Sequence, residues 1–319
     1  MAISIIIPTF DNVEFLEELI ESILKNQPNV PYEVMIGIDG CEKTKEYFES
    51  RRYQNNFLFF YFIKNEGPYK IKNTLSEIAN YENLFFFDSD DIMTETTIGK
   101  LNELLNKYEC VKPKFNNFKD SKGHRNFDNM PGQYGEGVFA IDKKLFLSMN
   151  GFEGWMCAAD SDFMGRIYKT GRKVGLTQEI LFHRRIHNKS LTRRKDTGYA
   201  SELRGEYSRI SKGKSYFGPL PTLSKNDYQI LDVETYEWSQ PISIIEKETV
   251  DQTKEIKRKK HELLDKLFDN SPKEIRPKQP KTIDYTTVNK NTNFQTQSNM
   301  QSALKKAKLE NIQKNFGRR

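Results

Sequence analysis

The chain has 319 residues, of which 36% are hydrophobic, and it carries a formal net charge of +6. Its apolar runs fall well short of the roughly 20 residues that a membrane-spanning helix needs. Its start lacks the basic region of a signal peptide, so we expect a first buried strand there. The three cysteines are far apart without metal-ligand spacing, which favours a reducing compartment over a disulfide framework. We therefore expect a cytoplasmic protein, with peripheral attachment at a membrane surface as an alternative.

The first ninety residues alternate between short apolar segments and amphipathic ones. Apolar runs of four to eight residues indicate strands buried on both faces, and apolar positions three and four apart indicate helices. Such alternation predicts a parallel sheet with right-handed crossovers. We predict strands at 4–8, 32–39, 57–64 and 83–88, with helices after Asp11 and at 71–79.

The next segment is more polar, and its pattern is less regular. We predict a loop or short hairpin over 111–134, strands at 138–142, 174–176 and 180–186, and helices at 143–149 and 161–170. Gly171 is suited to end the last helix because glycine adopts the left-handed conformation at a helix end. Residues 188–215 are basic with few apolar positions and suit a lid over a site.

Beyond residue 240 the composition changes. Residues 251–319 hold 17 Lys and Arg and 8 Asp and Glu, a net charge of +9, so residues 1–250 carry −3. Scattered apolar positions predict exposed helices, and the stretch rich in Lys, Pro and Asn at 270–298 predicts a linker. The expected organisation is a domain at 1–215, a connecting segment at 216–242 and a basic, helical and partly disordered extension at 243–319.

An acidic cluster follows the fourth predicted strand. The run Leu-Phe-Phe-Phe at 84–87 is followed by Asp88, Ser89, Asp90 and Asp91. Carboxylates this close repel one another unless a cation lies among them. Open α/β sheets bind ligands beyond the carboxyl ends of their strands. The pattern therefore predicts a divalent metal at this point; a helix cap is the structural alternative.

Several segments in order resemble family 2 glycosyltransferases. These are Ser-Ile-Ile-Ile-Pro-Thr-Phe (4–10), Ile-Gly-Ile-Asp-Gly (36–40), Asn-Glu-Gly-Pro-Tyr-Lys-Ile-Lys-Asn (65–73), Phe-Phe-Phe-Asp-Ser-Asp-Asp (85–91), Gly-Val-Phe-Ala-Ile (137–141), Asn-Gly-Phe (150–152) and Ala-Asp-Ser-Asp-Phe (159–163). Each segment alone is a weak signal, but their order and spacing are specific. The resemblance covers roughly residues 3–192 and implies a GT-A fold, with a mostly parallel, Rossmann-like sheet flanked by helices.

The resemblance also implies a donor site. Asp39 would bind uracil or a similar base, Asp88 would contact the ribose, and Asp90 would ligate Mn²⁺ or Mg²⁺ bridging the diphosphate. Lys72 stands where the family has Arg, which keeps the charge but loses the bidentate fork; on a helix surface it would more often be solvated. The other donor-binding positions implied are Pro8, Thr9, Phe10, Asn65, Ser89 and Arg185. For Asp91, a supporting role and a turn cap both stay open.

A second acidic pair, Asp160 and Asp162, lies at a predicted helix start. The family has Glu-Asp here, whereas this chain has Ala159 in place of the Glu. The resemblance implies that Asp160 is the general base, with Asp162 as the second candidate. The structural alternative is that both carboxylates only stabilise the start of the helix through its dipole. Gly137 and Trp155 would contact the acceptor, although Trp155 suits the core nearly as well.

Near residue 187 the chain resembles the family's Arg-x-His-x-x-Ser element. This makes His187 the expected metal-side histidine, with His183 as its rival. The basic run at 193–195 would close over the diphosphate, or would be an ordinary solvated surface.

The expected activity is transfer of a sugar from a nucleotide-sugar donor, with UDP favoured by the resemblance, to an acceptor hydroxyl. Single displacement with inversion fits the site, although GT-A folds host both stereochemical outcomes. The acceptor is a glycan, lipid or protein; the basic extension also suits nucleic acid, an anionic membrane or an acidic partner, so a hydroxylated base in DNA is an alternative. A catalytically degenerate scaffold is another. A nucleotidyltransferase is disfavoured because no glycine-rich phosphate loop follows the first strand.

Overall fold

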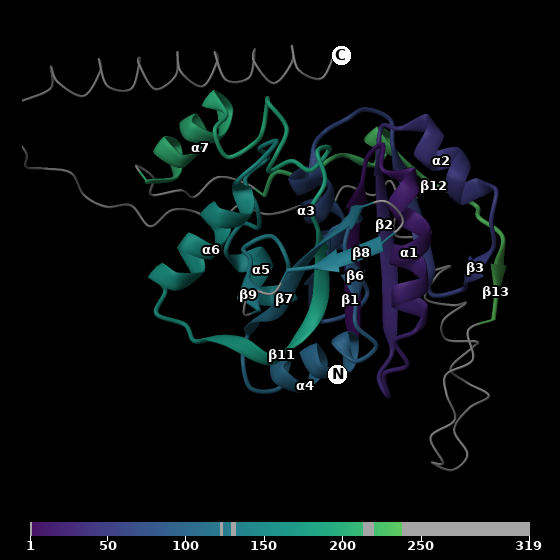
Figure 1. Ribbon diagram of the computed structural model, residues 1–319, viewed down its shortest axis with the longest axis horizontal. Coiled ribbons are helices and arrows are strands. Elements are labelled where there is room, and N and C mark those ends of the chain that lie inside the picture. Colours follow the sequence, from purple (N-terminus) through teal and green to yellow (C-terminus); the bar gives the residue numbers. More distant parts are fainter. Residues whose placement is uncertain (1, 122–123, 129–131, 213–219, 238–319) are drawn as a thin grey trace, which may run out of the picture. The chain divides into compact units, whose positions relative to one another are not determined.

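The computed structural model describes residues 2–121, 124–128, 132–212 and 220–237. Within these ranges, an eleven-stranded sheet forms the centre of the domain (Figure 1). Its strands are β1 (Ile3–Thr9), β2 (Tyr32–Asp39), β4 (Phe57–Phe62), β5 (Asn83–Phe86), β6 (Ile92–Met93), β7 (Cys110–Ser121), β8 (His124–Phe127), β9 (Gln133–Tyr134), β10 (Phe139–Asp142), β11 (Val174–Arg185) and β12 (Tyr228–Ile230).

The strand order is β12-β4-β2-β1-β5-β10-β7-β11-β6, with β8 and β9 paired to β7. Strands β4, β2, β1 and β5 are mutually parallel, and β10 is antiparallel to β5 and β7. Every residue of β1 and β2 is buried, as expected for parallel strands covered on both faces. This confirms the predicted α/β architecture with a central sheet flanked by helices. The predicted parallel arrangement holds for β4, β2, β1 and β5, but the whole sheet is mixed, with four parallel and six antiparallel strand pairs in the described ranges.

Seven α-helices lie in the described ranges. They are α1 (Val13–Leu24), α2 (Glu42–Glu49), α3 (Pro68–Ile78), α4 (Thr97–Leu105), α5 (Lys143–Ser148), α6 (Ala159–Lys169) and α7 (Glu202–Lys212). Helix α1 packs its apolar side into the same core cluster as Ile5 of β1. Helix α3 lies close against β2, because a Cβ built on Gly37 would be 2.3 Å from Cγ2 of Ile71.

Two predicted segments differ from the structure. The polar stretch predicted as a loop or short hairpin at 111–134 does form a hairpin between β7 and β8, but β7 is a twelve-residue strand that begins at Cys110 and is far longer than predicted. Strand β7 lies inside the sheet between β10 and β11, so pairing on both sides compensates for its polar sequence. The strands predicted at 174–176 and 180–186 form one strand, β11, with register shifts between Leu176 and Phe182.

The described part of the predicted connecting segment belongs to the sheet domain. Strand β12 pairs antiparallel with β4 at the sheet edge, and β13 (Thr235–Tyr236) pairs with β3 (Tyr53–Gln54) in a separate two-stranded sheet. The amide of Asn73 donates to the carbonyl of Pro221 at 3.1 Å. The predicted basic extension at 243–319 lies outside the described residues.

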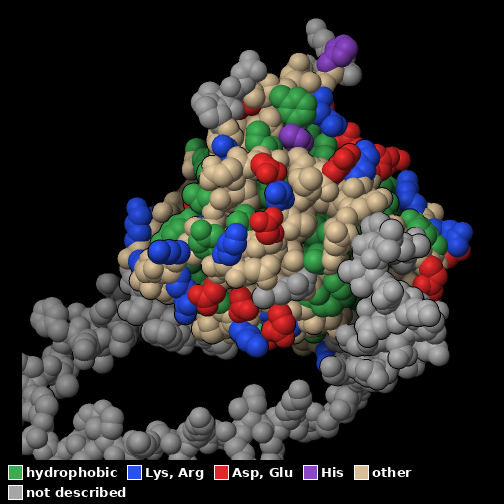
Figure 2. Space-filling model, turned by 90° about the horizontal axis from the view of Figure 1, so that it is seen from below, with side chains coloured by type: hydrophobic (Ala, Val, Ile, Leu, Met, Phe, Trp, Pro, Cys, Tyr) green, Lys and Arg blue, Asp and Glu red, His purple; other side chains and the backbone are tan. Residues whose placement is uncertain are grey.

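The surface of the described part is mixed in charge. Figure 2 shows Asp and Glu side chains interspersed with Lys and Arg on the face that it displays. No helix in the described ranges is long and apolar enough to cross a membrane.

Candidate active site

The predicted site residues meet where parallel strands end. Thr9 ends β1, Asp39 ends β2, and Asp88 follows β5 by two residues. Strand β10 runs antiparallel to β5 with Phe139 opposite Phe86, which brings Gly137 beside Asp88. The carboxyl ends of neighbouring parallel strands form the ligand-binding edge in open α/β sheets.

Two carboxylates face each other across Gly137. A Cβ built on Gly137 would lie 3.0 Å from Oδ2 of Asp160 and 3.7 Å from Oδ2 of Asp88. Asp160 comes from the first turn of α6, and its other oxygen, Oδ1, accepts a 2.9 Å hydrogen bond from the hydroxyl of Tyr69. The glycine therefore leaves open the space that both carboxylates border.

Lys72 is buried beneath this pair. Its Nζ lies 3.1 Å from Oδ1 of Asp88 and 3.4 Å from the carbonyl oxygen of Gly137, and the side chain is only 3% exposed. This burial contradicts the alternative that Lys72 is a solvated surface residue. Loss of hydration inside the protein raises the pKa of Asp88. The positive charge of Lys72 lowers this pKa, and the negative charges of Asp90 and Asp160 raise it further. One lysine against three carboxylates leaves room for additional positive charge.

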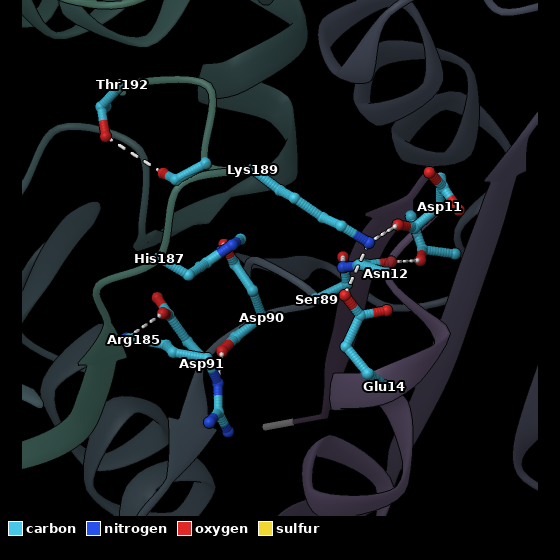
Figure 3. Close-up of polar contacts among 12 residues, drawn as sticks. Asp11, Asn12, Glu14, Ser89, Asp90, Asp91, Arg185, His187, Lys189 and Thr192 are labelled. Carbon is cyan, nitrogen blue, oxygen red and sulfur yellow. Dashed lines mark hydrogen bonds and ion pairs between the residues drawn. The ribbon is translucent and has the colours of Figure 1, made fainter. Parts of the chain in front are cut away.

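Asp90 and His187 form the other predicted pair. The side chains lie toward one another in Figure 3, with Nε2 of His187 2.7 Å from Oδ2 of Asp90. The imidazole packs on Phe15 with a ring-centre distance of 4.7 Å. The rival His183 faces elsewhere, because its ring contacts Asn116 and Phe127.

A divalent metal fits this pair only as a partly protein-bound ion. Within the described ranges, no group of three or more His, Cys, Asp or Glu side chains is arranged to hold a metal. Mg²⁺ is commonly held by one or two carboxylates together with substrate phosphates and water. Carboxylate oxygens also suit Mn²⁺, and imidazole nitrogen is a common ligand of divalent transition-metal ions. Asp90 and His187 match such an incomplete ligand set.

Arg185 supports the Asp90 segment from inside the protein. Its Nε donates to the carbonyl of Asp90 at 3.0 Å, and its terminal nitrogens pair with Glu18 and Asp120. The guanidinium is only 4% exposed and packs on the rings of Phe15 and Phe118. Because these internal contacts occupy the guanidinium, the structure does not support a direct role of Arg185 in donor binding.

Asp91 has a structural place in the same turn. Its carboxylate accepts a 2.9 Å hydrogen bond from the backbone N–H of Arg185, and the residue is 2% exposed. Burial raises the pKa of Asp91 well above its usual range, and the charges of Asp90 and Asp88 add to this. Asp91 thus connects the acidic turn to the end of β11 instead of facing the site.

Hydrogen bonds hold the donor side of the predicted site. The hydroxyl of Thr9 donates to Asn12, whose amide donates to the hydroxyl of Ser89 at 2.7 Å. This network connects the end of β1 to the acidic turn. Pro8 is buried within β1, whereas Phe10 is 42% exposed and available to a ligand.

The carboxylate of Asp39 accepts hydrogen bonds from the backbone N–H groups of Glu66 and Gly67 at 2.7 and 3.1 Å. Burial raises the pKa of Asp39 to about 7. A Cβ on Gly40 would lie 2.5 Å from the backbone nitrogen of Asn65, so the two loops touch. These contacts fix the start of α3, and a direct role of Asp39 or Asn65 in base recognition stays a prediction.

Two predicted residues have other partners. Asp162 is 7% exposed and accepts a 2.9 Å hydrogen bond from Nε of Arg166, which also binds the carbonyl of Gly151 at 2.6 Å. Asp162 therefore holds α6 to the preceding loop and is not placed as the base. Trp155 is 8% exposed and stacks on Tyr207 of α7 at 4.6 Å, which supports the core alternative over acceptor contact.

The predicted lid is a series of turns followed by α7. Lys189 reaches across to α1, where its Nζ lies 2.7 Å from Oε1 of Glu14 (Figure 3). Arg194 pairs with Asp196, while Arg193 and Lys195 are exposed. These residues follow the His187 segment, and the side chains of Lys189 and Arg194 bind Glu14 and Asp196 instead of the acidic cluster.

Sequence reasoning missed Tyr69, which contacts Asp160. The missed signal was the helix start: Gly67 has φ of +84° at the N-cap and Pro68 occupies the first position, an arrangement that proline favours. A helix beginning at Pro68 instead of 71 puts Tyr69 three residues before Lys72, on the same face.

Comparison with known proteins identifies the family. Residues 4–164, about half of the chain, match the family model described as glycosyl transferase family 2. The chain is 34% identical over 121 residues to an uncharacterized glycosyltransferase of Mycoplasma genitalium, covering 35% of this chain and 40% of that protein. It is 30% identical over 102 residues to the poly(ribitol-phosphate) beta-N-acetylglucosaminyltransferase TarS of Staphylococcus aureus, covering 31% of this chain and 18% of that protein.

The chain thus spans less than half the length of these two relatives. The crystal structure of S. aureus TarS 1–349 in complex with UDP-GlcNAc is similar with a TM-score of 0.47 and 17% identity, covering 59% of each chain. On the match to residues 4–164, the chain belongs to glycosyl transferase family 2.

Proposed function

We propose that the protein transfers a sugar from a nucleotide-sugar donor to an acceptor hydroxyl. The observation that carries this proposal is the pair of carboxylates, Asp88 and Asp160, that border one open space at Gly137. One belongs to the strand-end cluster that would hold the donor, and the other comes from the start of α6. A donor and an acceptor brought together between them would have a base on one side and a charged leaving group on the other.

The proposed reaction is a single displacement. Asp160 takes the proton of the acceptor hydroxyl, the acceptor oxygen bonds to the anomeric carbon, and the bond from that carbon to the diphosphate breaks, its electron pair leaving with the diphosphate. General-base catalysis of this kind contributes typically 10²–10⁴-fold in rate. Attack from the face opposite the leaving group inverts the configuration at the anomeric carbon.

The leaving side needs positive charge. Lys72 lies 3.1 Å from Asp88 and supplies one buried cation there. We propose that Asp90 and His187 would hold Mn²⁺ or Mg²⁺ together with the diphosphate. A divalent ion of this kind neutralises the negative charge that gathers on the departing nucleoside diphosphate.

The first donors to test are UDP-linked sugars. The resemblance in the sequence favours UDP, and the S. aureus relative is named an N-acetylglucosaminyltransferase. UDP-N-acetylglucosamine is therefore the first donor in a screen for hydrolysis with Mn²⁺, measured by release of UDP without added acceptor.

Three variants test the assignments in this screen. We expect Asp90→Ala to abolish the Mn²⁺ dependence and Asp160→Asn to lower hydrolysis at least 10²-fold, because water also needs the base. The matched control is Asp162→Asn, which removes a carboxylate two positions away and should retain the rate per folded molecule. Donor hydrolysis with unchanged metal dependence in Asp90→Ala would exclude the metal assignment. Unaltered activity in Asp160→Asn would exclude Asp160 as the base.

A further inference from the structure

The carboxylate of Asp160 has two oxygens in different surroundings. Oδ1 accepts the hydrogen bond from the hydroxyl of Tyr69 at 2.9 Å. Oδ2 points to the open space at Gly137, where a Cβ would come within 3.0 Å of it. One oxygen is thus committed to the protein, and the other borders the space where the acceptor is proposed to bind.

Tyr69 is itself held rigidly. It lies in the first turn of α3, is 7% exposed, and packs its ring on Phe152 at 5.3 Å. The loop before this turn is fixed by the hydrogen bonds from Glu66 and Gly67 to Asp39. A side chain with a locked rotamer on a fixed helix start can orient a reacting group accurately.

We propose that Tyr69 is the positioning residue for the base: its hydroxyl fixes the Asp160 carboxylate so that Oδ2 alone receives the acceptor proton. This inference rests on the proposed function of Asp160. Nothing in the family resemblance assigns a role to Tyr69, and the sequence alone does not place it beside Asp160.

The hydroxyl of Tyr69 stays protonated throughout the proposed step. Burial raises its pKa well above 10, and the negative charge of Asp160 raises it further. Tyr69 therefore donates and does not exchange its proton with the base. The acceptor proton moves to Oδ2, the bond from the acceptor oxygen to the anomeric carbon forms, and the donor's bond to its diphosphate breaks with the electron pair on the diphosphate.

Other charged and titratable groups surround this pair. From neighbouring elements these are Asp88 after β5, Lys72 on α3, Arg204 on α7, and Cys157 and Asp196 in the adjoining loops. The test therefore compares variants that leave all five of these groups in place.

The central experiment is Tyr69→Phe, which removes the hydroxyl and keeps the ring. The hydroxyl donates a hydrogen bond to the carboxylate of Asp160, and such a bond favours the ionised form of the base. Loss of this hydrogen bond should therefore move the acidic limb of the pH profile of kcat/KM up by about one to two pH units. We expect kcat/KM for the acceptor, or for water in hydrolysis, to fall about tenfold with unchanged KM for the donor.

A merely structural tyrosine would not move the pH profile. The matched control is Tyr134→Phe, which removes a partly buried hydroxyl that donates to the backbone carbonyl of Thr177 at 2.6 Å instead of to a carboxylate. Circular dichroism and thermal unfolding verify that both variants fold. The double variant Tyr69→Phe/Asp160→Asn should be no slower than Asp160→Asn alone, because Tyr69 acts through Asp160.

The outcomes separate this inference from the proposed function. Wild-type transfer in Asp160→Asn would mean that the proposed base is wrong. Loss of activity in Asp160→Asn, together with an unmoved acidic limb in folded Tyr69→Phe or additive losses in the double variant, would overturn the role of Tyr69 alone.

Discussion

Replacing Arg185 tests whether it supports the site from inside or binds the donor. Arg185→Met removes the charge-assisted contacts to Glu18 and Asp120 and the hydrogen bond to the carbonyl of Asp90. Removing one partner of a buried ion pair costs about 3–5 kcal/mol. The side chains of Glu18 and Asp120 are 43% and 47% exposed, so water can partly replace the arginine as their partner. We therefore expect Arg185→Met to lower the free energy of unfolding by roughly 2–3 kcal/mol.

The assay is urea unfolding followed by fluorescence, with Arg185→Lys as the conservative variant. Lysine keeps the charge but not the planar fork, so it should restore only part of the loss. Metal dependence gives a second measurement: the apparent KM for Mn²⁺ should rise because the Asp90 turn loses its support.

The affinity of Arg185→Met for UDP, measured with a chelator that removes the metal, should equal that of the wild type, because the guanidinium is occupied by internal contacts. An unfolding free energy of Arg185→Met within about 0.5 kcal/mol of the wild type would refute the reasoning, since that is the range of ordinary surface substitutions. A tenfold loss of metal-free UDP affinity would do so too and would return Arg185 to the donor site.

Three further predictions follow from single contacts. Gly137→Ala should cut transfer at least about tenfold with little change in unfolding free energy, because its Cβ would lie 3.0 Å from Oδ2 of Asp160; full transfer would contradict the proposed space. The pKa of Asp39 is about 7 in the folded state and about 3.9 in the unfolded state, so between these two pH values only the folded state binds the proton. The contribution of Asp39 to stability is therefore complete below about pH 4 and is lost as the pH rises through 7. The unfolding free energy should fall by roughly 1.4 kcal/mol per pH unit between pH 5 and 7 from this group, and Asp39→Asn should flatten that slope; an equal slope in the variant would count against it. Trp155→Phe should lose about 1–2 kcal/mol of stability through its stack on Tyr207 while leaving the KM for the acceptor unchanged, and a large rise in that KM would restore Trp155 to the acceptor site.

The alternation of strands and helices was predictable over the first ninety residues, because β1 and β2 are predominantly apolar and therefore need cover on both faces. The polar strand β7 was not predictable from its own residues. Its place between β10 and β11 supplies hydrogen bonds on both sides, and that long-range pairing outweighs a weak local preference. The same holds for β12, whose partner β4 is more than 160 residues away in the chain.

The sequence by itself determined the family and the acidic cluster after β5, because the order of short motifs along the chain does not depend on their packing. It could not choose between Asp160 and Asp162, since residues two apart on a helix point roughly 200° apart and only the orientation of α6 decides which one faces the site. The tertiary structure turned Asp160 toward Gly137 and Tyr69, and Asp162 toward Arg166. It likewise placed Lys72 under Asp88 and enclosed Arg185 among internal partners, because burial and pairing of charges are set by segments distant in the chain.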